Sequence, residues 1–152
     1  MPNIPIVVQT VEDRPLVKVV YDVIPAPAAG QNVTLTVPQG YRFQLKSIFL
    51  SVTTDANAVD RNYFVQLATA AGVVLYFRHP FVITNGETRA LCVAQGLPLI
   101  AHSVIGMNAT FPWPDNLVIE EGDILTIGLS AIQVGDQFTA ASYMALSQFV
   151  AE

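Results

Sequence analysis

Apolar and polar residues alternate with a period of two along most of the chain. Residues 33–37 read Val-Thr-Leu-Thr-Val, so the valines and the leucine share one face and the threonines share the other. Residues 41–46 repeat the alternation, because three apolar residues that begin with Tyr41 alternate with Arg, Gln and Lys. A two-residue period predicts β-strands, each with one buried and one solvated face.

The alternation changes parity once within a strand. After Lys46 the apolar positions move by one residue, to Ile48, Leu50 and Val52. An extra residue in one strand of an antiparallel pair has this effect. We therefore predict a β-bulge near Ser47.

Two stretches share a second pattern, in which two β-rich segments meet at a glycine. In residues 37–45 the break falls at Gly40, and in residues 118–129 it falls at Gly122. A third Gly-Asp turn, at Gly135, precedes the final apolar run. Glycine at such breaks is typical of tight turns between strands. The candidate corner or interface residues in these turns are Gly40, Tyr41, Gly122 and Gly135.

The rest of the chain continues the strand pattern without a convincing amphipathic helix. Residues 63–77 predict a hairpin, 91–93 and 97–100 predict two short strands, and 138–150 predict a last strand. The Phe-Pro-Trp-Pro segment at 111–114 must run as a loop or at a sheet edge. Roughly eight to ten strands predict an all-β fold, an antiparallel two-sheet β-sandwich of the jelly-roll type.

The first residues differ from this body. Residues 1–24 contain two stretches rich in Val and Ile, and their prolines at positions 2 and 5 cannot donate to a strand ladder. We expect residues 1–24 to form an extended N-terminal arm or edge strands. Residues 25–31 are rich in Pro, Ala and Gly and predict a linker, and residues 32–152 predict the sandwich domain.

Composition indicates a protein that is buried against other protein. The chain has 152 residues, enough for one domain, and 52% are hydrophobic while only 12% are charged, against about 25% in an ordinary soluble domain. The cores of protein interfaces are depleted of charge in this way. No apolar run approaches the ~20 residues of a spanning helix, so we expect no membrane partner. The net charge of −5 and seven scattered basic residues argue against direct nucleic-acid binding.

The residues by themselves predict no catalytic, cofactor or metal site, so we expect a protein that is not an enzyme. His79 and His102 have no ligand spacing, and Cys92 has apolar neighbours that predict a small buried side chain. The densest acidic group is Glu120, Glu121 and Asp123. Calcium binding is the alternative there, because carboxylates are hard-oxygen ligands, but a solvated turn is favoured.

Trp113 allows two interpretations. An exposed tryptophan can stack on a sugar ring, which would suggest a carbohydrate-binding module. Prolines on both sides of Trp113 instead favour a side chain that fills one end of the sandwich or a subunit contact. We favour the second interpretation and count Trp113 among the corner or interface residues.

Several of these motifs together resemble a known family. They are Val33-Thr34-Leu35-Thr36-Val37-Pro38-x-Gly40-Tyr41-Arg42-Phe43-x-Leu45, the pair Arg61-Asn62, the corner at 117–125, and Ile132-x-x-Gly135-Asp136-x-Phe138. This order is similar to the jelly-roll cement or decoration proteins on the capsids of tailed bacteriophages. The resemblance covers about residues 30–150, and residues 1–24 fall outside it.

The resemblance implies a function and a setting. Proteins of this family are virion structural proteins, usually homotrimers on the outer capsid surface, that bridge neighbouring subunits of the major capsid protein and stabilise the head shell. The chain would be made in the host bacterial cytoplasm, and its N-terminal arm would reach a neighbouring subunit or the shell. The alternative is a carbohydrate- or receptor-binding jelly-roll module of a phage tail or spike.

Overall fold

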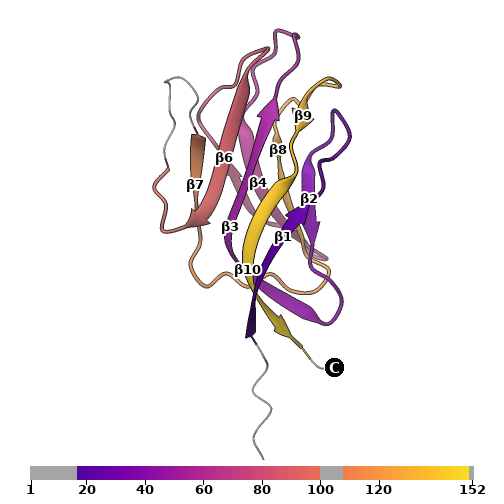
Figure 1. Cartoon of the computed structure of the whole chain (residues 1–152), viewed down its shortest axis with the longest axis vertical. Helices are drawn as coiled ribbons and strands as arrows, with labels where there is room; N and C mark the ends of the chain where they lie inside the picture. Colours follow the sequence, from indigo (N-terminus) through magenta and orange to yellow (C-terminus); the bar gives the residue numbers. More distant parts are fainter. Residues whose placement is uncertain (1–16, 100–107, 151–152) are drawn as a thin grey trace, which may run out of the picture.

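The computed structural model describes residues 17–99 and 108–150, which form ten strands in two sheets (Figure 1). Sheet A contains β1 (Val17–Ile24), β3 (Tyr41–Thr53), β6 (Thr88–Gln95), β7 (Asn108–Trp113), β9 (Gln137–Phe138) and β10 (Ala141–Phe149). Sheet B contains β2 (Val33–Thr36), β4 (Tyr63–Thr69), β5 (Gly72–Arg78) and β8 (Ile124–Leu129). The described residues contain no helix, so the prediction of an all-β, two-sheet fold is confirmed.

The strand order interleaves distant parts of the chain. Sheet A runs β1-β10-β3-β6-β7, with β9 paired to β3, and sheet B runs β2-β8-β4-β5. In Figure 1 the strands β3, β6 and β10 lie in front of β4 and β8. The inward side chains of both sheets fill the space between them, and each buried leucine, isoleucine or valine stabilises the fold by roughly 1.5–3 kcal/mol. They include Val33, Leu45, Leu50, Val65, Leu91, Leu125 and Ile127.

The predicted bulge is present in β3. Ala145 of β10 faces Leu45, whereas the preceding Met144 faces Ser47, so Lys46 is the extra residue on β3. Because the bulge restores the register, Leu45 and Ile48 both point inward, and each is only 1% exposed. The change of apolar parity in the sequence therefore marks this position correctly.

The segments from β6 to β7 differ from the prediction. β7 pairs with β6 in parallel, not antiparallel, although it does lie at a sheet edge as expected for the Phe-Pro-Trp-Pro segment. Leu97 to Leu99 form no strand, since Pro98 lacks the amide that a ladder needs. Residue 100, the last of that expected strand, lies outside the described residues.

Part of the expected arm is an edge strand. β1 pairs antiparallel with β10 along its whole length, while residues 1–16 lie outside the described residues. The linker 25–31 connects β1 in sheet A to β2 in sheet B. It is held in place because the Gly30 amide donates to the Asp136 carbonyl at 2.8 Å and the Gln137 side chain donates to the Pro27 carbonyl at 2.9 Å.

Across the described segments, no helix is long and apolar enough to cross a membrane.

Candidate functional site

The two glycine corners that the sequence predicts lie against each other. Phe43 and Ile119 exchange both backbone hydrogen bonds, at 2.8 and 2.7 Å. The Gly122 amide donates to the Val37 carbonyl at 3.1 Å, and the Val37 amide donates to the Asp123 carbonyl at 3.2 Å. We call this pair of turns, residues 37–43 and 118–123, the corner clamp. It joins the β2–β3 connection to the approach to β8.

The acidic residues of the corner clamp bond to the clamp itself. The Glu121 carboxylate accepts from the Gly40 amide at 3.0 Å, and Arg42 lies 3.4 Å from the Glu120 carboxylate. The Asp123 carboxylate accepts from the Glu120 amide at 3.0 Å. Among the described residues no three or more His, Cys, Asp or Glu side chains are grouped to hold a metal ion. The turn is solvated, as we predicted, but its carboxylates also fasten the two corners together.

Gly40 and Gly122 both have a positive φ, and Gly122 is the one whose added Cβ would meet no neighbouring atom. Its φ is +78°, in the left-handed region, and no heavy atom would lie within 4 Å of an added Cβ. We therefore expect Gly122→Ala to lower the free energy of unfolding by about 1–2 kcal/mol through backbone strain alone. Gly122→Asn should cost less, because asparagine tolerates this conformation better. Urea unfolding measures both, and an alanine variant as stable as the wild type would contradict this interpretation.

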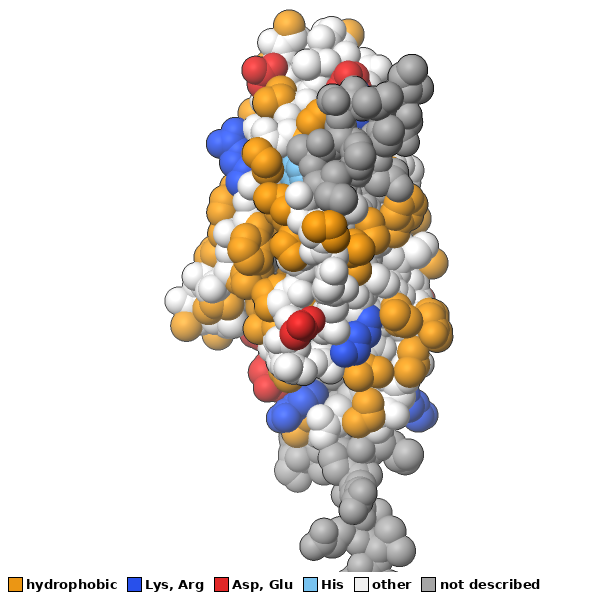
Figure 2. Space-filling model, turned by 90° about the vertical axis from the view of Figure 1, so that its left-hand side faces the viewer, with side chains coloured by type: hydrophobic (Ala, Val, Ile, Leu, Met, Phe, Trp, Pro, Cys, Tyr) orange, Lys and Arg blue, Asp and Glu red, His pale blue; other side chains and the backbone are white. Residues whose placement is uncertain are grey.

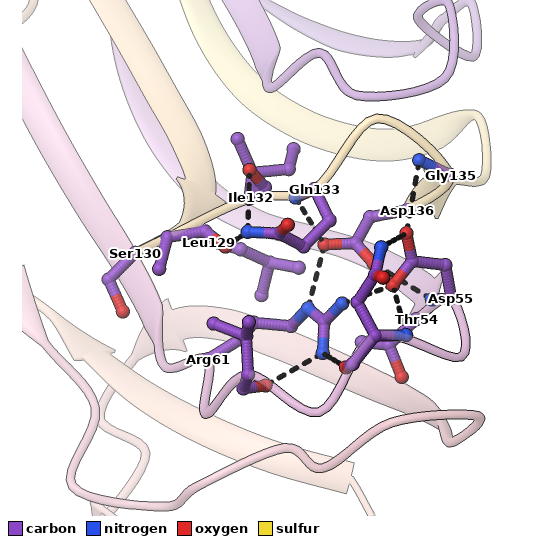
Figure 3. Close-up of polar contacts among 12 residues, drawn as sticks. Thr54, Asp55, Arg61, Leu129, Ser130, Ile132, Gln133, Gly135 and Asp136 are labelled. Atoms are coloured by element: carbon purple, nitrogen blue, oxygen red, sulfur yellow. Dashed lines mark hydrogen bonds and ion pairs between the residues drawn. The ribbon is translucent and has the colours of Figure 1, made fainter.

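A buried arginine ties together two loops at the end of the sandwich (Figure 3). Arg61 is fully buried, and its Nε lies 2.8 Å from Oδ2 of Asp136, which is also fully buried. Its Nη2 forms a short ion pair with Asp55, and its Nη1 donates to the carbonyls of Asn57 and Val59 at 3.1 and 2.7 Å. All three guanidinium nitrogens therefore bond to groups of this chain, as a buried charge requires.

Asp136 receives further donors in the same cluster. The amides of Gln133 and Asp55 both donate to its carboxylate at 2.8 Å. Gly135 lies so close that an added Cβ would be 2.8 Å from the Cβ of Asp55. Gly135 therefore has no room for a side chain, because Asp55 lies against it. Arg61 holds the turn through its ion pair with Asp136. The cluster of Asp55, Arg61 and Asp136 fixes the loops 54–62 and 130–137.

Asp55 makes the stability of this cluster depend on pH. Although desolvation raises the pKa of Asp55, hydrogen bonds from Asn57, the charge of Arg61 and the Gly135 amide together lower that pKa below 3.8. A lowered pKa in the folded state contributes stability that is present above the ordinary carboxyl pKa and is lost as pH falls through the folded pKa. We expect urea unfolding between about pH 5 and 2 to show a smaller loss of stability in Asp55→Asn than in the wild type. Equal losses would contradict the assignment.

The histidines and the cysteine offer no reactive site among the described residues. His79 is fully buried, its Nδ1 accepts from the Phe81 amide at 3.1 Å, and its ring meets the Phe111 ring edge-on at 5.0 Å. His102 lies outside the described residues. Cys92 is half-buried rather than buried, because Leu91 and Val93 take the inward positions of β6. Burial raises the pKa of the Cys92 thiol, so the thiol is protonated at neutral pH.

Trp113 and Tyr41 have different environments. Trp113 is only 2% exposed and belongs to the core, so it offers no surface on which a sugar could stack. The buried environment agrees with the expectation that Trp113 fills the sandwich. Tyr41 belongs to the corner clamp and is 40% exposed, and its ring packs edge-on against Phe149 with 5.5 Å between centroids. Of the five candidate residues, Tyr41 thus presents a large apolar side chain to solvent.

Of the sixteen large apolar side chains exposed among the described residues, eight lie on two edge strands, which the sequence did not predict. On β1 they are Val17, Val19, Tyr21 and Val23, and on β5 they are Val73, Val74, Tyr76 and Phe77. A shallow hollow of about 510 Å³ on the outer face of sheet A is lined by residues that include Tyr21, Phe49 and Met144. Figure 2 shows a broad apolar area on another side of the molecule, where charged side chains are few and scattered. Exposed apolar surface of this extent is typical of protein interaction sites.

No protein-family model, curated protein or solved structure matches the chain. The residues that carry the resemblance described above do occupy definite places in the fold. Two of its motifs meet in the corner clamp, and the other two meet in the Arg61 cluster. The corner clamp and the Arg61 cluster hold the sandwich together, and the candidate functional region is the exposed apolar surface on β1 and β5.

Proposed function

We propose that the protein is a non-enzymatic structural protein of a bacteriophage virion, most specifically a capsid decoration protein. It would self-associate, as a homotrimer if it follows the family that it resembles, and bridge neighbouring subunits of the major capsid protein on the outside of the head shell. The observation that carries this proposal is the combination of a charge-poor chain with large apolar side chains left exposed on β1 and β5.

The strand order supports a jelly roll as the finer description of the fold. The order β1-β10-β3-β6 faces the order β2-β8-β4-β5, and the chain crosses between the sheets at most of its connections. Two interleaved four-stranded sheets of this kind make up jelly rolls, which are common in viral capsid proteins and lectins. β7 and β9 would be additions to that framework. This support is analogy at the level of the fold.

The surface supports binding to protein rather than catalysis. Exposed apolar side chains on edge strands can be covered by a neighbouring subunit, and each square ångström of apolar surface buried contributes about 25 cal/mol. The corner clamp and the Arg61 cluster would keep both ends of the sandwich rigid while it bridges subunits. Weak contacts become strong when one oligomer makes several of them at once, which suits a repeated shell.

Binding to shells tests the proposal. The full chain is added to head shells prepared without it, and sedimentation separates bound from free protein. We expect a saturable, stoichiometric amount to sediment with the shells, and we expect the decorated shells to release their genome at a higher temperature than undecorated ones. Protein that remains in the supernatant at every concentration, with shells that open at an unchanged temperature, would overturn the proposal.

A further inference from the structure

We propose that two copies of the protein associate through β1, whose open edge pairs antiparallel with β1 of a second copy about a two-fold axis at Val20. This contact goes beyond the proposed function, because it can form whether or not the protein binds a shell. A two-fold contact would also add to a three-fold one, so that the two together would link trimers to one another.

The geometry of β1 leaves one edge open. β1 pairs only with β10, so the amides and carbonyls of its other edge have no partner strand within residues 17–99 and 108–150. The Val23 amide donates to the Asp22 carboxylate at 2.8 Å, which places that amide on the open side. Alternate residues of a strand point their amides the same way, so the amides of Val17, Val19 and Tyr21 face the open edge too.

The charges on β1 select a second copy of the same strand. Lys18 and Asp22 lie two residues to either side of Val20, and both are exposed. In an antiparallel pair centred on Val20, each Lys18 faces Asp22 of the second copy directly. Opposite charges in this position stabilise a strand pair. Within residues 17–99 and 108–150 neither side chain forms an ion pair. The contact would exchange the bond between the Val23 amide and the Asp22 carboxylate for one from that amide to the second copy, which releases the Asp22 carboxylate for Lys18.

The apolar side chains fit the same register. Val19 then faces Tyr21 of the second copy, and Val17 faces Val23, all on the outer face of sheet A. These four side chains are between 53 and 75% exposed in the single chain. Pairs of aromatic and β-branched residues in directly opposite positions are favourable. The β1 contact would therefore cover the apolar side chains as well as pair the charges.

Other registers and other edges lack this match. An axis at Tyr21 sets Lys18 opposite Ile24 and Asp22 opposite Val20, so neither charge meets its opposite. An axis between two residues would pair odd-numbered with even-numbered positions, and the exposed apolar side chains of one copy would then lie beside the charged side chains of the other. β2 has four residues without charge, β5 carries only a basic residue, and β7 contains a proline. Of the four strands that end the two sheets in the described part of the chain, β1 is the self-complementary one.

Disulfide formation tests the position of the axis. In a Cys92→Ala background, Val20→Cys places a single cysteine directly opposite itself, within the reach of a disulfide. Val23→Cys is the matched control, because residue 23 faces residue 17 of the second copy. We expect mild oxidation to convert most of the Val20→Cys protein to a covalent dimer and little of the control. Equal yields in the two variants would overturn the proposal.

Charge reversal tests the pairing of Lys18 with Asp22. Lys18→Asp or Asp22→Lys alone should raise the Kd of association about tenfold, since each removes two attractions and adds two repulsions. The double variant should restore the wild-type Kd, while Asp60→Lys, at an exposed loop position, should leave it unchanged. Sedimentation equilibrium measures the Kd of the four variants and of the wild type. If single reversals do not weaken association, or even strengthen it, the charges guard the edge against pairing and the proposal is wrong.

These outcomes separate the β1 contact from the proposed function. If the Val20→Cys dimer forms but the protein does not bind shells, the β1 contact is supported and the proposed function is wrong. If the protein binds shells but the two cysteine variants give equal disulfide yields, the proposed function is supported and the β1 contact is wrong.

Discussion

Replacing Arg61 with leucine is expected to lower the free energy of unfolding by about 3–5 kcal/mol. The substitution leaves Asp136 fully buried without its cation, and it removes the donors to two loop carbonyls. An uncompensated buried charge costs far more than a lost surface interaction. Urea unfolding, followed by the fluorescence of the single tryptophan, measures the change.

Two further variants show whether the charge is the cause. Arg42→Leu removes an arginine whose ion pair with Glu120 is exposed, at 37% and 56% of the two side chains, and it should cost no more than about 1 kcal/mol. Asp136→Asn in the Arg61→Leu background removes the stranded charge and should recover part of the lost stability. If Arg61→Leu costs no more than Arg42→Leu, the cluster does not stabilise the fold as described.

The second large effect is expected at Trp113. Because this side chain is only 2% exposed and lies in the core, Trp113→Ala should lower the free energy of unfolding by about 3–5 kcal/mol. Tyr21→Ala is the comparison, since Tyr21 is 75% exposed, and it should change stability by no more than about 0.5 kcal/mol when the protein is dilute.

Fluorescence adds an independent measurement at Trp113. Its emission should be resistant to a soluble quencher in the native state and should become sensitive on unfolding. Ready quenching of the native protein, or a Trp113→Ala variant of unchanged stability, would mean that Trp113 is a surface residue. The sugar-stacking interpretation would then become tenable again.

Local pattern predicted those parts of the fold that depend on neighbouring residues. The parity change after Lys46 located the bulge, because one extra residue reverses the faces of a strand. Gly40 and Gly122 located the two corners, because each has a positive φ that other residues adopt at a cost. These signals are short-range, so a single sequence contains them.

Contacts between residues far apart in the chain could not be predicted from these short-range signals. Arg61 and Asp136 are 75 residues apart, and each taken alone reads as an ordinary charged residue near a turn. Gly135 was expected to be a corner, but its need for glycine comes from Asp55 across the cluster. The parallel course of β7 and the exposure of β1 likewise depend on which strands become neighbours, and alternation of side chains does not determine that.

Imaging of the native phage particle by electron cryomicroscopy tests the central claim most directly. We expect density that fits this two-sheet sandwich on the outer surface of the head, repeated with the symmetry of the shell and in contact with two or more major capsid subunits. A particle that lacks the chain, or that carries it only on the tail away from the head, would contradict the account.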